Sequence, residues 1–334
     1  MSRLRTRLFG LSPDEATFER RGFPACGEHQ RRRLETIGRT FLTGYHAALD
    51  ARDSTDLRRR LDGVELELRG FAFEGAGMAL GMMDMLLPWR RDRWRSFAES
   101  EGQAHIYMLY VGLGWALARM RRRVEAPLAT RDPLLRWLAL DGYGFHEGYF
   151  HWREVSEQHA VPARLKGYAR RAFDQGVGRS LWFIHGADVA RIVACIGGFP
   201  ESRHSDLWSG VGLASAYAGG VEKAVLDHLV GLSGSHFPAL AQGVLFATET
   251  RLNAGNLLPH TTLACRTICN ISVEQASAMV NIDRRELRYD AAEPAYEIWR
   301  SRLQSHFSPQ AELPTLSSPL VRPIAYHDTR SLES

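Results

Sequence analysis

The chain has 334 residues, of which 45% are apolar and 24% are charged, and its formal net charge is +4. This balance is typical of a globular protein and excludes an intrinsically disordered chain. Residues 1–60 contain 13 Arg against 8 Asp and Glu, a balance of +5, so the remaining residues balance near −1. The basic character therefore belongs to the N-terminal region.

Helical spacing of apolar residues dominates the chain, and no sustained β-branched alternation bounded by turn signals is present, so we predict an all-α fold. The predicted helices cover residues 31–50, 54–61, 65–87, 103–122, 132–152, 162–184, 187–197, 201–217, 221–231, 236–253, 259–269, 272–281 and 294–305.

Four short patterns recur in the same order in the two halves of the chain, which predicts an array built from two diverged tandem repeats. Their Gly and Ala residues would let helices approach closely, because a missing side chain removes the spacer between two backbones. The matches pair Gly38-Arg-Thr40 with Gly178-Arg-Ser180, Gly75-Ala-Gly-Met-Ala79 with Gly210-Val-Gly-Leu-Ala214, Gly114-Trp-Ala-Leu-Ala118 with Gly243-Val-Leu-Phe-Ala247, and Leu138-Ala139 with Leu263-Ala264.

This organisation predicts four parts of the chain. A basic N-terminal segment at 1–30 precedes the first helical repeat at 31–160 and the second at 161–305. A tail at 306–334, rich in Pro and Ser, completes it, and we expect no helix there.

The basic residues are almost all Arg, because only Lys166 and Lys223 are lysines. A nucleic-acid site needs a continuous basic face interleaved with aromatic residues for stacking, so we interpret the Arg runs as solvated helix faces and expect no nucleic-acid partner. The runs are Arg31 to Arg33, Arg58 to Arg60 and Arg121 to Arg123.

Four cysteines are too few for a disulfide framework, and no apolar signal region follows the basic start, so we expect a cytoplasmic protein. The longest apolar run, 104–118, is broken by His105 and falls short of the ~20 residues that cross a bilayer. Residues 2–11 alternate Arg with Leu and Phe. Two interpretations of them stay open: contact with a membrane surface or partner, and a terminus that is docked or frayed.

Glu74 is the first candidate for chemistry, because it lies in an apolar stretch and matches Ser209 in the second half of the chain. A carboxyl group in such surroundings loses hydration, which raises its pKa toward the range useful for acid–base catalysis. The alternative is a structural Glu at a helix edge that pairs with an Arg such as Arg69.

The segment 141–151 is the densest in aromatic, glycine and titratable residues, and we predict it as a binding wall. Asp141, Tyr143 and Tyr149 are its candidate ligand contacts, and His146 and Glu147 are candidate proton-transfer groups. Plain core packing is the alternative. His146 and His151 are five residues apart rather than the four that place two zinc ligands on one helix face, so we predict no metal here.

Three further residues are predicted to contact a ligand, namely Arg179, Trp182 and Trp208. Because Arg39 is the repeat partner of Arg179, a structural tie to a carboxylate is the alternative for the arginine. His260, Cys265 and Cys269 suggest a soft-metal or haem cluster, although buried free cysteine is the commoner arrangement. We therefore predict no cofactor.

Several spaced motifs together resemble a bacterial family of unknown function that is found in enediyne polyketide gene clusters, over about residues 1–305. They are Arg20-Arg-Gly-Phe23, Glu74-Gly-Ala-Gly-Met78, Asp141-Gly-Tyr-Gly-Phe-His146, Gly178-Arg-Ser-Leu-Trp182, Asp206-Leu-Trp-Ser-Gly210 and Pro259-His260 to Cys265-Arg266.

The resemblance implies a role in building or maturing the enediyne core from a polyketide-derived polyene, beside a membrane electron-transport-like protein and a repeat protein. It implies no catalytic residues. Our first hypothesis is an enzyme or accessory enzyme that shelters a hydrophobic polyene in an aromatic cavity, with Glu74, His146 and Glu147 transferring protons. The alternatives are a non-catalytic scaffold or carrier, which binds the same intermediate or docks pathway proteins, and a haem or metal redox protein. A homodimer is a further interpretation of the partners.

Overall fold

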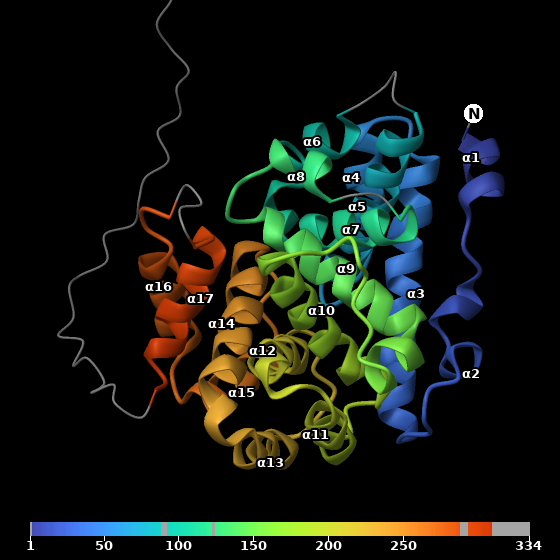
Figure 1. Ribbon diagram of the computed structural model, residues 1–334. Coiled ribbons are helices and arrows are strands. Elements are labelled where there is room, and N and C mark those ends of the chain that lie inside the picture. The colour runs from blue at the N-terminus through green and yellow to red at the C-terminus, as the bar shows by residue number, and fades with distance from the viewer. Residues whose placement is uncertain (1, 88–91, 122–123, 288–292, 309–334) are drawn as a thin grey trace, which may run out of the picture.

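The computed structural model describes residues 2–87, 92–121, 124–287 and 293–308, and the prediction of a tail at 306–334 lies mostly outside them. Within these ranges the chain forms helices and turns and no β-strand, which confirms the all-α prediction. Seven inner helices make the body of the protein (Figure 1): α3 (Glu28–Asp50), α5 (Arg69–Leu86), α7 (Ile106–Arg119), α9 (Arg136–Phe150), α10 (Tyr168–Ile184), α12 (Glu201–Tyr217) and α14 (Phe237–Asn253).

The inner helices form a row in chain order, in which each packs on the one before it and the one after it. Figure 1 follows this row from α3 in blue, through green and yellow, to α14 in orange. Shorter helices cover its ends and faces, and two of them, α6 and α8, fall in segments where we predicted no helix. The covering helices are α4 (Ser54–Asp62), α6 (Arg93–Ala98), α8 (Glu125–Ala129), α11 (Val189–Gly198), α13 (Lys223–Ser233), α15 (Pro259–Ala264), α16 (Val273–Asp283) and α17 (Ala295–Ser305).

A Gly-x-Gly motif explains how closely the inner helices approach. Two residues turn a helix by about 200°, so the two glycines face opposite neighbours. In each motif the first glycine contacts the preceding inner helix and the second contacts the following one, and a Cβ on either would overlap that neighbour's backbone. The motifs are Gly75 and Gly77 in α5, Gly112 and Gly114 in α7, Gly142 and Gly144 in α9, Gly176 and Gly178 in α10, and Gly210 and Gly212 in α12.

The residue before the first glycine is polar in most of these helices, and these side chains meet on one side of the row. Gln175 donates to Asp141 (Nε2 to Oδ2, 2.8 Å), and the hydroxyl of Ser209 donates to Gln242, which precedes Gly243 of α14 (2.8 Å). Glu74 of α5 reaches Arg179 of α10 across helices that are not neighbours in the row. The row therefore curls around these polar side chains, which we refer to as the polar axis.

The N-terminal segment is docked along α3 rather than frayed. Its helices are α1 (Ser2–Phe9) and α2 (Phe18–Arg21). The Tyr45 hydroxyl donates to the carbonyl of Phe9 (2.8 Å), and the amide of Leu11 donates to His46 Nε2 (3.1 Å). We refer to residues 10–23 as the strap, because Leu11, Glu15 and Ala16 within them line a cavity described below.

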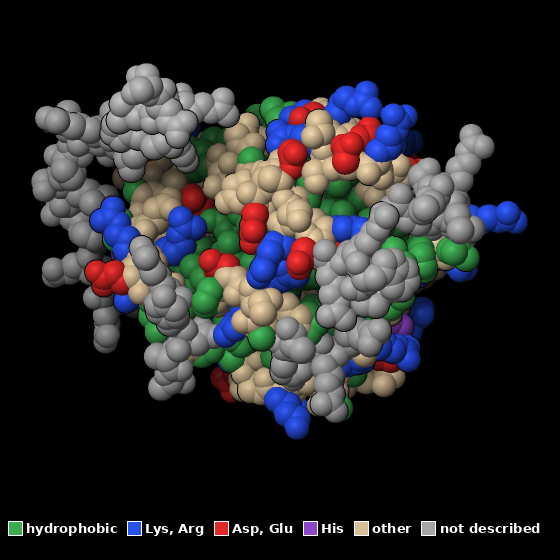
Figure 2. Space-filling view, turned by 90° about the horizontal axis from the view of Figure 1, so that it is seen from above, with side chains coloured by type: hydrophobic (Ala, Val, Ile, Leu, Met, Phe, Trp, Pro, Cys, Tyr) green, Lys and Arg blue, Asp and Glu red, His purple; other side chains and the backbone are tan. Residues whose placement is uncertain are grey.

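Charges of both signs share the surface, as the intermingled Arg and acidic side chains in Figure 2 show. Two of the predicted Arg runs carry ion pairs within their helices, including Arg32 with Glu28 (2.6 Å) and Arg58 with Asp62 (2.7 Å). Both pairs join residues four apart on a helix, which is the arrangement expected of solvated helix faces. Of the third run, Arg122 and Arg123 lie outside the described residues.

One helical stretch among the described residues, Lys223–Asn253, is long and apolar enough to cross a membrane by length and composition alone. It consists of α13, a 3₁₀ turn and α14. Helix α14 packs against α12, α16 and α17 inside the protein, and a buried core helix passes the same test.

Candidate functional site

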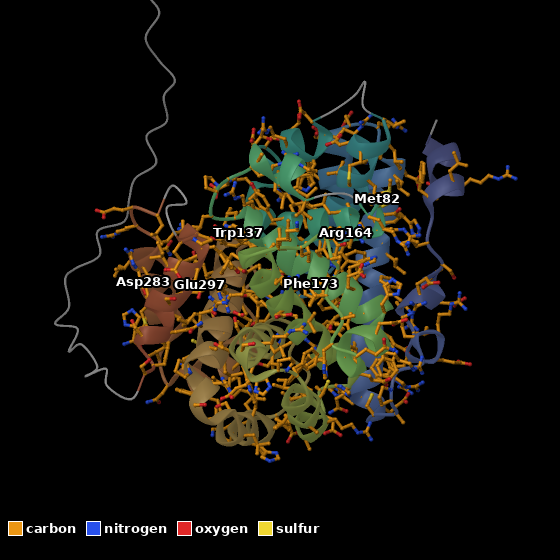
Figure 3. All side chains as sticks on the ribbon, viewed as in Figure 1. Met82, Trp137, Arg164, Phe173, Asp283 and Glu297 are labelled. Atoms are coloured by element: carbon orange, nitrogen blue, oxygen red, sulfur yellow. The ribbon has the colours of Figure 1, made fainter. Side chains whose placement is uncertain are left out.

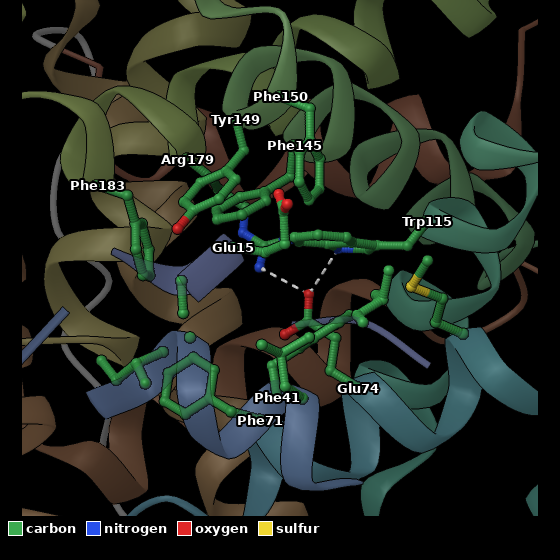
Figure 4. Close-up of a pocket in the computed structure, with 16 residues that line it drawn as sticks. Glu15, Phe41, Phe71, Glu74, Trp115, Phe145, Tyr149, Phe150, Arg179 and Phe183 are labelled. Atoms are coloured by element: carbon green, nitrogen blue, oxygen red, sulfur yellow. Dashed lines mark hydrogen bonds and ion pairs between the residues drawn. The ribbon is translucent and has the colours of Figure 1, made fainter. Parts of the chain in front are cut away.

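A cavity lined mostly by aromatic and aliphatic side chains lies among the strap, α3, α5, α7, α9 and α10 (Figure 4), and we refer to it as the aromatic cavity. Its empty space is about 590 Å³, less than half of that of the polar groove described below, about 1320 Å³. Its lining consists of Leu11, Glu15, Ala16, Ile37, Gly38, Phe41, Leu42, Phe71, Glu74, Met78, Trp115, Phe145, Tyr149, Phe150, Arg179 and Phe183.

Ring contacts fix the shape of the aromatic cavity. The ring centroid of Trp115 lies 4.4 Å from that of Phe41 and 5.2 Å from that of Phe145, which in turn lies 5.1 Å from Phe183. Rings at these separations hold one another in place. The walls that these rings form are apolar.

Glu74 is a buried acidic group of this cavity. The indole Nε1 of Trp115 donates a 3.0 Å hydrogen bond to Oε1 of Glu74, and Nη2 of Arg179 lies 3.9 Å from the same oxygen (Figure 4). Burial raises the pKa of Glu74 to about 7, and the nearby Asp141 adds to this, while Arg179 and the indole hydrogen bond oppose it. A carboxyl group with such a pKa is present in both protonation states at neutral pH and can give or take a proton.

Arg179 is held in place by a second carboxylate. Its Nη1 pairs with Asp141, which also accepts the hydrogen bond from Gln175. Although burial alone would lower it, the pKa of Arg179 is raised by Asp141 and Glu74, so the guanidinium stays charged. Both interpretations of Arg179 therefore apply, since it is tied to a carboxylate and also lines the aromatic cavity.

A second apolar cavity lies on the other side of Arg179, and we refer to it as the distal cavity. Its empty space is about 480 Å³. Arg179 lines both cavities, whereas Glu74 lines only the first and Asp141 only the second. The lining of the distal cavity consists of Tyr107, Met108, Val111, Leu138, Asp141, Arg179, Leu213, Tyr217, Phe246, Glu249, Thr250 and Trp299.

The other two predicted proton-transfer residues, His146 and Glu147, line a wide polar groove. Oε1 of Glu147 lies 3.2 Å from Nδ1 of His146, and burial lowers the pKa of that imidazole. Met82, Arg119 and Arg164 also line the groove, and Figure 3 labels Met82 and Arg164. The empty space of the groove is about 1320 Å³, compared with about 590 Å³ for the aromatic cavity.

Trp115 stands between these two places, so Glu74 does not line the same space as His146 and Glu147. The indole donates to Glu74 on one side, and its ring contacts His146 edge-on at 5.6 Å on another. His146 and Glu147 line the groove and not the aromatic cavity. The three residues are neighbours through Trp115 but do not face one space.

The predicted ligand contacts divide in the same way. Tyr149 lines the aromatic cavity, Asp141 the distal cavity and Arg179 both. Tyr143, Trp182 and Trp208 are buried in the core and line neither cavity nor the groove.

Sequence reasoning missed several residues of the polar axis, namely Trp115, Gln175, Gln242 and Arg300. Arg300 of α17 donates to Gln242 (Nε to Oε1, 3.2 Å) and pairs with Asp206 (Nη2 to Oδ1, 2.8 Å). A signal for Gln175 and Gln242 was present, because each directly precedes a glycine that contacts the preceding inner helix. Nothing in the local sequence points to Trp115 or Arg300.

His260, Cys265 and Cys269 have separate structural roles. His260 Nε2 lies 3.2 Å from the carbonyl of Tyr217, and Cys269 is buried with its sulfur 3.6 Å from the carbonyl of Ala241. In the part of the chain that the structure describes, no three His, Cys, Asp or Glu side chains are grouped so that they could hold a metal ion.

The chain was compared with known proteins. A family model described as "Protein of unknown function (DUF1702)" matches residues 1–307. The chain belongs to this family. No curated protein and no solved structure matches it significantly. The matched residues include the strap, the inner helices and α17, and therefore all residues that line the aromatic cavity.

Proposed function

We propose that the protein binds an apolar, unsaturated small molecule in the aromatic cavity and exchanges a proton with it through Glu74. The observation that carries this proposal is the position of Glu74, a buried carboxyl group with a pKa of about 7 in a cavity lined mostly by aromatic and aliphatic side chains. Burial is costly for an ionisable group unless it is paired or functional, and perturbed pKa values concentrate at functional sites.

The surrounding residues suit a simple proton exchange. Protonated Glu74 donates its proton to a carbon of a conjugated double bond, which leaves an allylic cation on the ligand and a carboxylate on Glu74. The faces of Phe41 and Trp115 stabilise the cation, and Arg179 stabilises the carboxylate. Return of a proton from the ligand to Glu74 restores the acid and leaves the double bonds in their original or a shifted arrangement.

In biosynthetic terms, we propose that the ligand is a polyketide-derived polyene and that the protein acts during enediyne core formation. The motif resemblance supports this pathway, and the apolar cavity supports a ligand of that chemistry. We also propose a cytoplasmic location, with the N-terminal segment available for contact with a membrane and its redox partner protein.

The test uses deuterium. The purified protein is incubated in D₂O with cis-parinaric acid, a fluorescent conjugated tetraene, and deuterium incorporation is measured by mass spectrometry. Wild type should incorporate deuterium and shift the ultraviolet spectrum, whereas Glu74→Gln should bind the probe without exchange. Glu249→Gln, which changes a carboxylate of the distal cavity, is the matched control and should behave as wild type. Equal exchange in wild type and Glu74→Gln would disprove the role of Glu74.

A non-catalytic carrier is the second candidate, and the strap favours it, because Leu11, Glu15 and Ala16 form part of the cavity wall and would enclose a bound molecule. A carrier binds the probe as tightly in Glu74→Gln as in wild type and incorporates no deuterium in either. In the producing organism, a carrier tolerates Glu74→Gln without loss of product.

We further infer that residues 31–160 and 161–305 are diverged copies of one unit. Glu74 and Ser209 support this, because each directly precedes the first glycine of a Gly-x-Gly motif. Other glycines of the sequence match are not equivalent in their contacts, since Gly114 faces the following inner helix and Gly243 the preceding one. A repeat unit of a single inner helix, each with its own Gly-x-Gly motif, accounts for more of these glycine contacts than the two long copies do.

A further inference from the structure

The aromatic and distal cavities share one residue, Arg179, as the partition between them. Their walls also meet beside it, because Phe71 of the aromatic cavity contacts Tyr217 of the distal cavity with ring centroids 5.1 Å apart. Both cavities are mostly apolar, and their charged lining residues are Arg179, Glu74, Asp141, Glu15 and Glu249. Because Arg179 is the one lining residue that the two cavities share, we expect its removal to join them.

Arg179 is not free to swing aside as a gate. Its Nη1 pairs with Asp141 inside the protein, and both side chains are almost fully buried. Breaking a buried ion pair leaves two uncompensated charges, which is strongly unfavourable. A ligand in the aromatic cavity therefore ends at Arg179.

The guanidinium still has hydrogen-bonding capacity toward the aromatic cavity. Nη1 is used by Asp141, whereas Nη2 lies 3.9 Å from Glu74, too far for a hydrogen bond. Guanidinium groups bind carboxylate oxygens in preference to apolar groups. The end of the cavity is thus polar and positively charged, while its walls are apolar.

We propose that Arg179 sets both the length and the end group of the ligand: the aromatic cavity takes an extended apolar chain whose terminal carboxylate or carbonyl oxygen binds the Arg179 guanidinium. This inference rests on the proposed function, because it requires that the aromatic cavity bind a ligand. It adds a specificity-determining residue and a chemical class, a chain with an oxygen at one end.

The experiment measures affinity against chain length. Straight-chain acids from octanoic to eicosanoic acid compete with cis-parinaric acid, followed by its fluorescence. In wild type, affinity should rise by about fourfold for each added methylene group that the aromatic cavity can still bury. For longer acids the affinity should stay constant, and we refer to this constant value as the plateau. The methyl ester of the preferred acid retains its carbonyl oxygen but loses the charge, and the parent alkane loses both, so affinity should fall in that order.

Removal of the Arg179–Asp141 ion pair should increase the chain length at which affinity stops rising. The double variant Arg179→Met with Asp141→Asn removes both partners of the ion pair at once, which avoids leaving Asp141 as an unpaired buried carboxylate, and the amide oxygen introduced by Asp141→Asn can still accept from Gln175. Without the guanidinium, Glu74 should hold its proton more tightly. Its affinity should continue to rise for acids beyond the wild-type plateau, and it should no longer favour the acid over the alkane. Circular dichroism checks that the variant folds, and Arg179→Lys provides a second variant that keeps the charge and the wild-type plateau.

A larger side chain in the distal cavity tests whether the longer acids occupy that cavity in the double variant. Leu138 lies one turn before Asp141 on α9 and lines the distal cavity. Leu138→Trp should not change the affinities of wild type, but should restore the shorter plateau in the double variant. An unchanged plateau in a folded double variant would overturn this inference and leave the proposed function intact. Failure of wild type to bind any of these chains would overturn the proposed function itself.

Discussion

Glu74 and Trp115 form a direct hydrogen bond between the acidic group and an aromatic wall of the aromatic cavity, with indole Nε1 donating to Oε1 at 3.0 Å. The two residues come from different inner helices, α5 and α7, which the contact between Gly112 and the backbone of Glu74 brings together. Close helix packing thus places the indole beside the carboxyl group, and this relationship leads to the first prediction.

Trp115→Phe should raise the pKa of Glu74 above its wild-type value of about 7. The indole hydrogen bond favours the charged carboxylate, and hydrogen bonds to charged groups contribute about 1.5–3 kcal/mol, so the expected rise is about 1 to 2 pKa units. The carbonyl stretch of protonated Glu74, followed by infrared difference spectroscopy against pH, measures this. A pKa equal to or below that of wild type contradicts the prediction.

The stability of the protein should depend on pH through Glu74. The pKa of Glu74 is about 7 in the folded state against 4.5 ordinarily, so the folded state holds this proton more tightly and its stabilisation is complete below pH 4.5. Stability should fall as pH rises from 4.5 to 7, by roughly 3 kcal/mol from this residue.

The measurement compares urea denaturation of wild type and Glu74→Gln across pH. Because Gln does not ionise, the difference in unfolding free energy between the two proteins should change in favour of the variant between pH 4.5 and 7. Other buried carboxyls, such as Asp174, whose pKa burial raises to about 6, cancel in this difference. A difference that stays constant with pH would show that Glu74 does not titrate in this range.

The sequence predicted most of the inner helices because apolar spacing and helix caps are local properties. The capping box of Ser272 and Gln275, for example, is visible in four consecutive letters and is present at the start of α16. Glu74 was also found locally, as a carboxyl group in an apolar stretch. Its partner Trp115 lies 41 positions away on the neighbouring helix α7, and Arg179 lies 105 positions away on α10, which only the curl of the helix row brings close.

The aromatic wall at 141–151 was predicted as one surface, but a helix presents its residues in several directions. Tyr149 faces the aromatic cavity, His146 faces the groove, and Tyr143 is buried away from both. Which direction becomes a cavity depends on the neighbouring helices. That information is carried by the Gly-x-Gly contacts, whose repetition in every inner helix from α5 to α12 the two-repeat interpretation did not include.

Substitution of a glycine in these motifs should destabilise the protein severely. In Gly176→Ala the new methyl group would overlap the backbone carbonyl of Asp141, and backbone atoms of a packed helix cannot move aside cheaply. We expect a loss of roughly 3 kcal/mol or more, measured by chemical denaturation. Gly231→Ala is the control. That glycine lies inside α13 with no atom near the added methyl, so it should gain about 0.5–1 kcal/mol of stability from helix propensity.

The link between α17 and the inner helices should depend on a buried ion pair. Arg300 is fully buried, and its Nη2 lies 2.8 Å from Oδ1 of Asp206. Arg300→Met alone should cost about 3–5 kcal/mol, because it removes one of the positive charges that neutralise a buried carboxylate. Arg171 also pairs with Asp206 (3.0 Å) but is partly exposed, so it should compensate only in part.

Adding Asp206→Asn to Arg300→Met should recover much of this loss, and a double-mutant cycle of unfolding free energies measures the recovery. Strictly additive losses would mean that the two side chains do not stabilise the protein through each other.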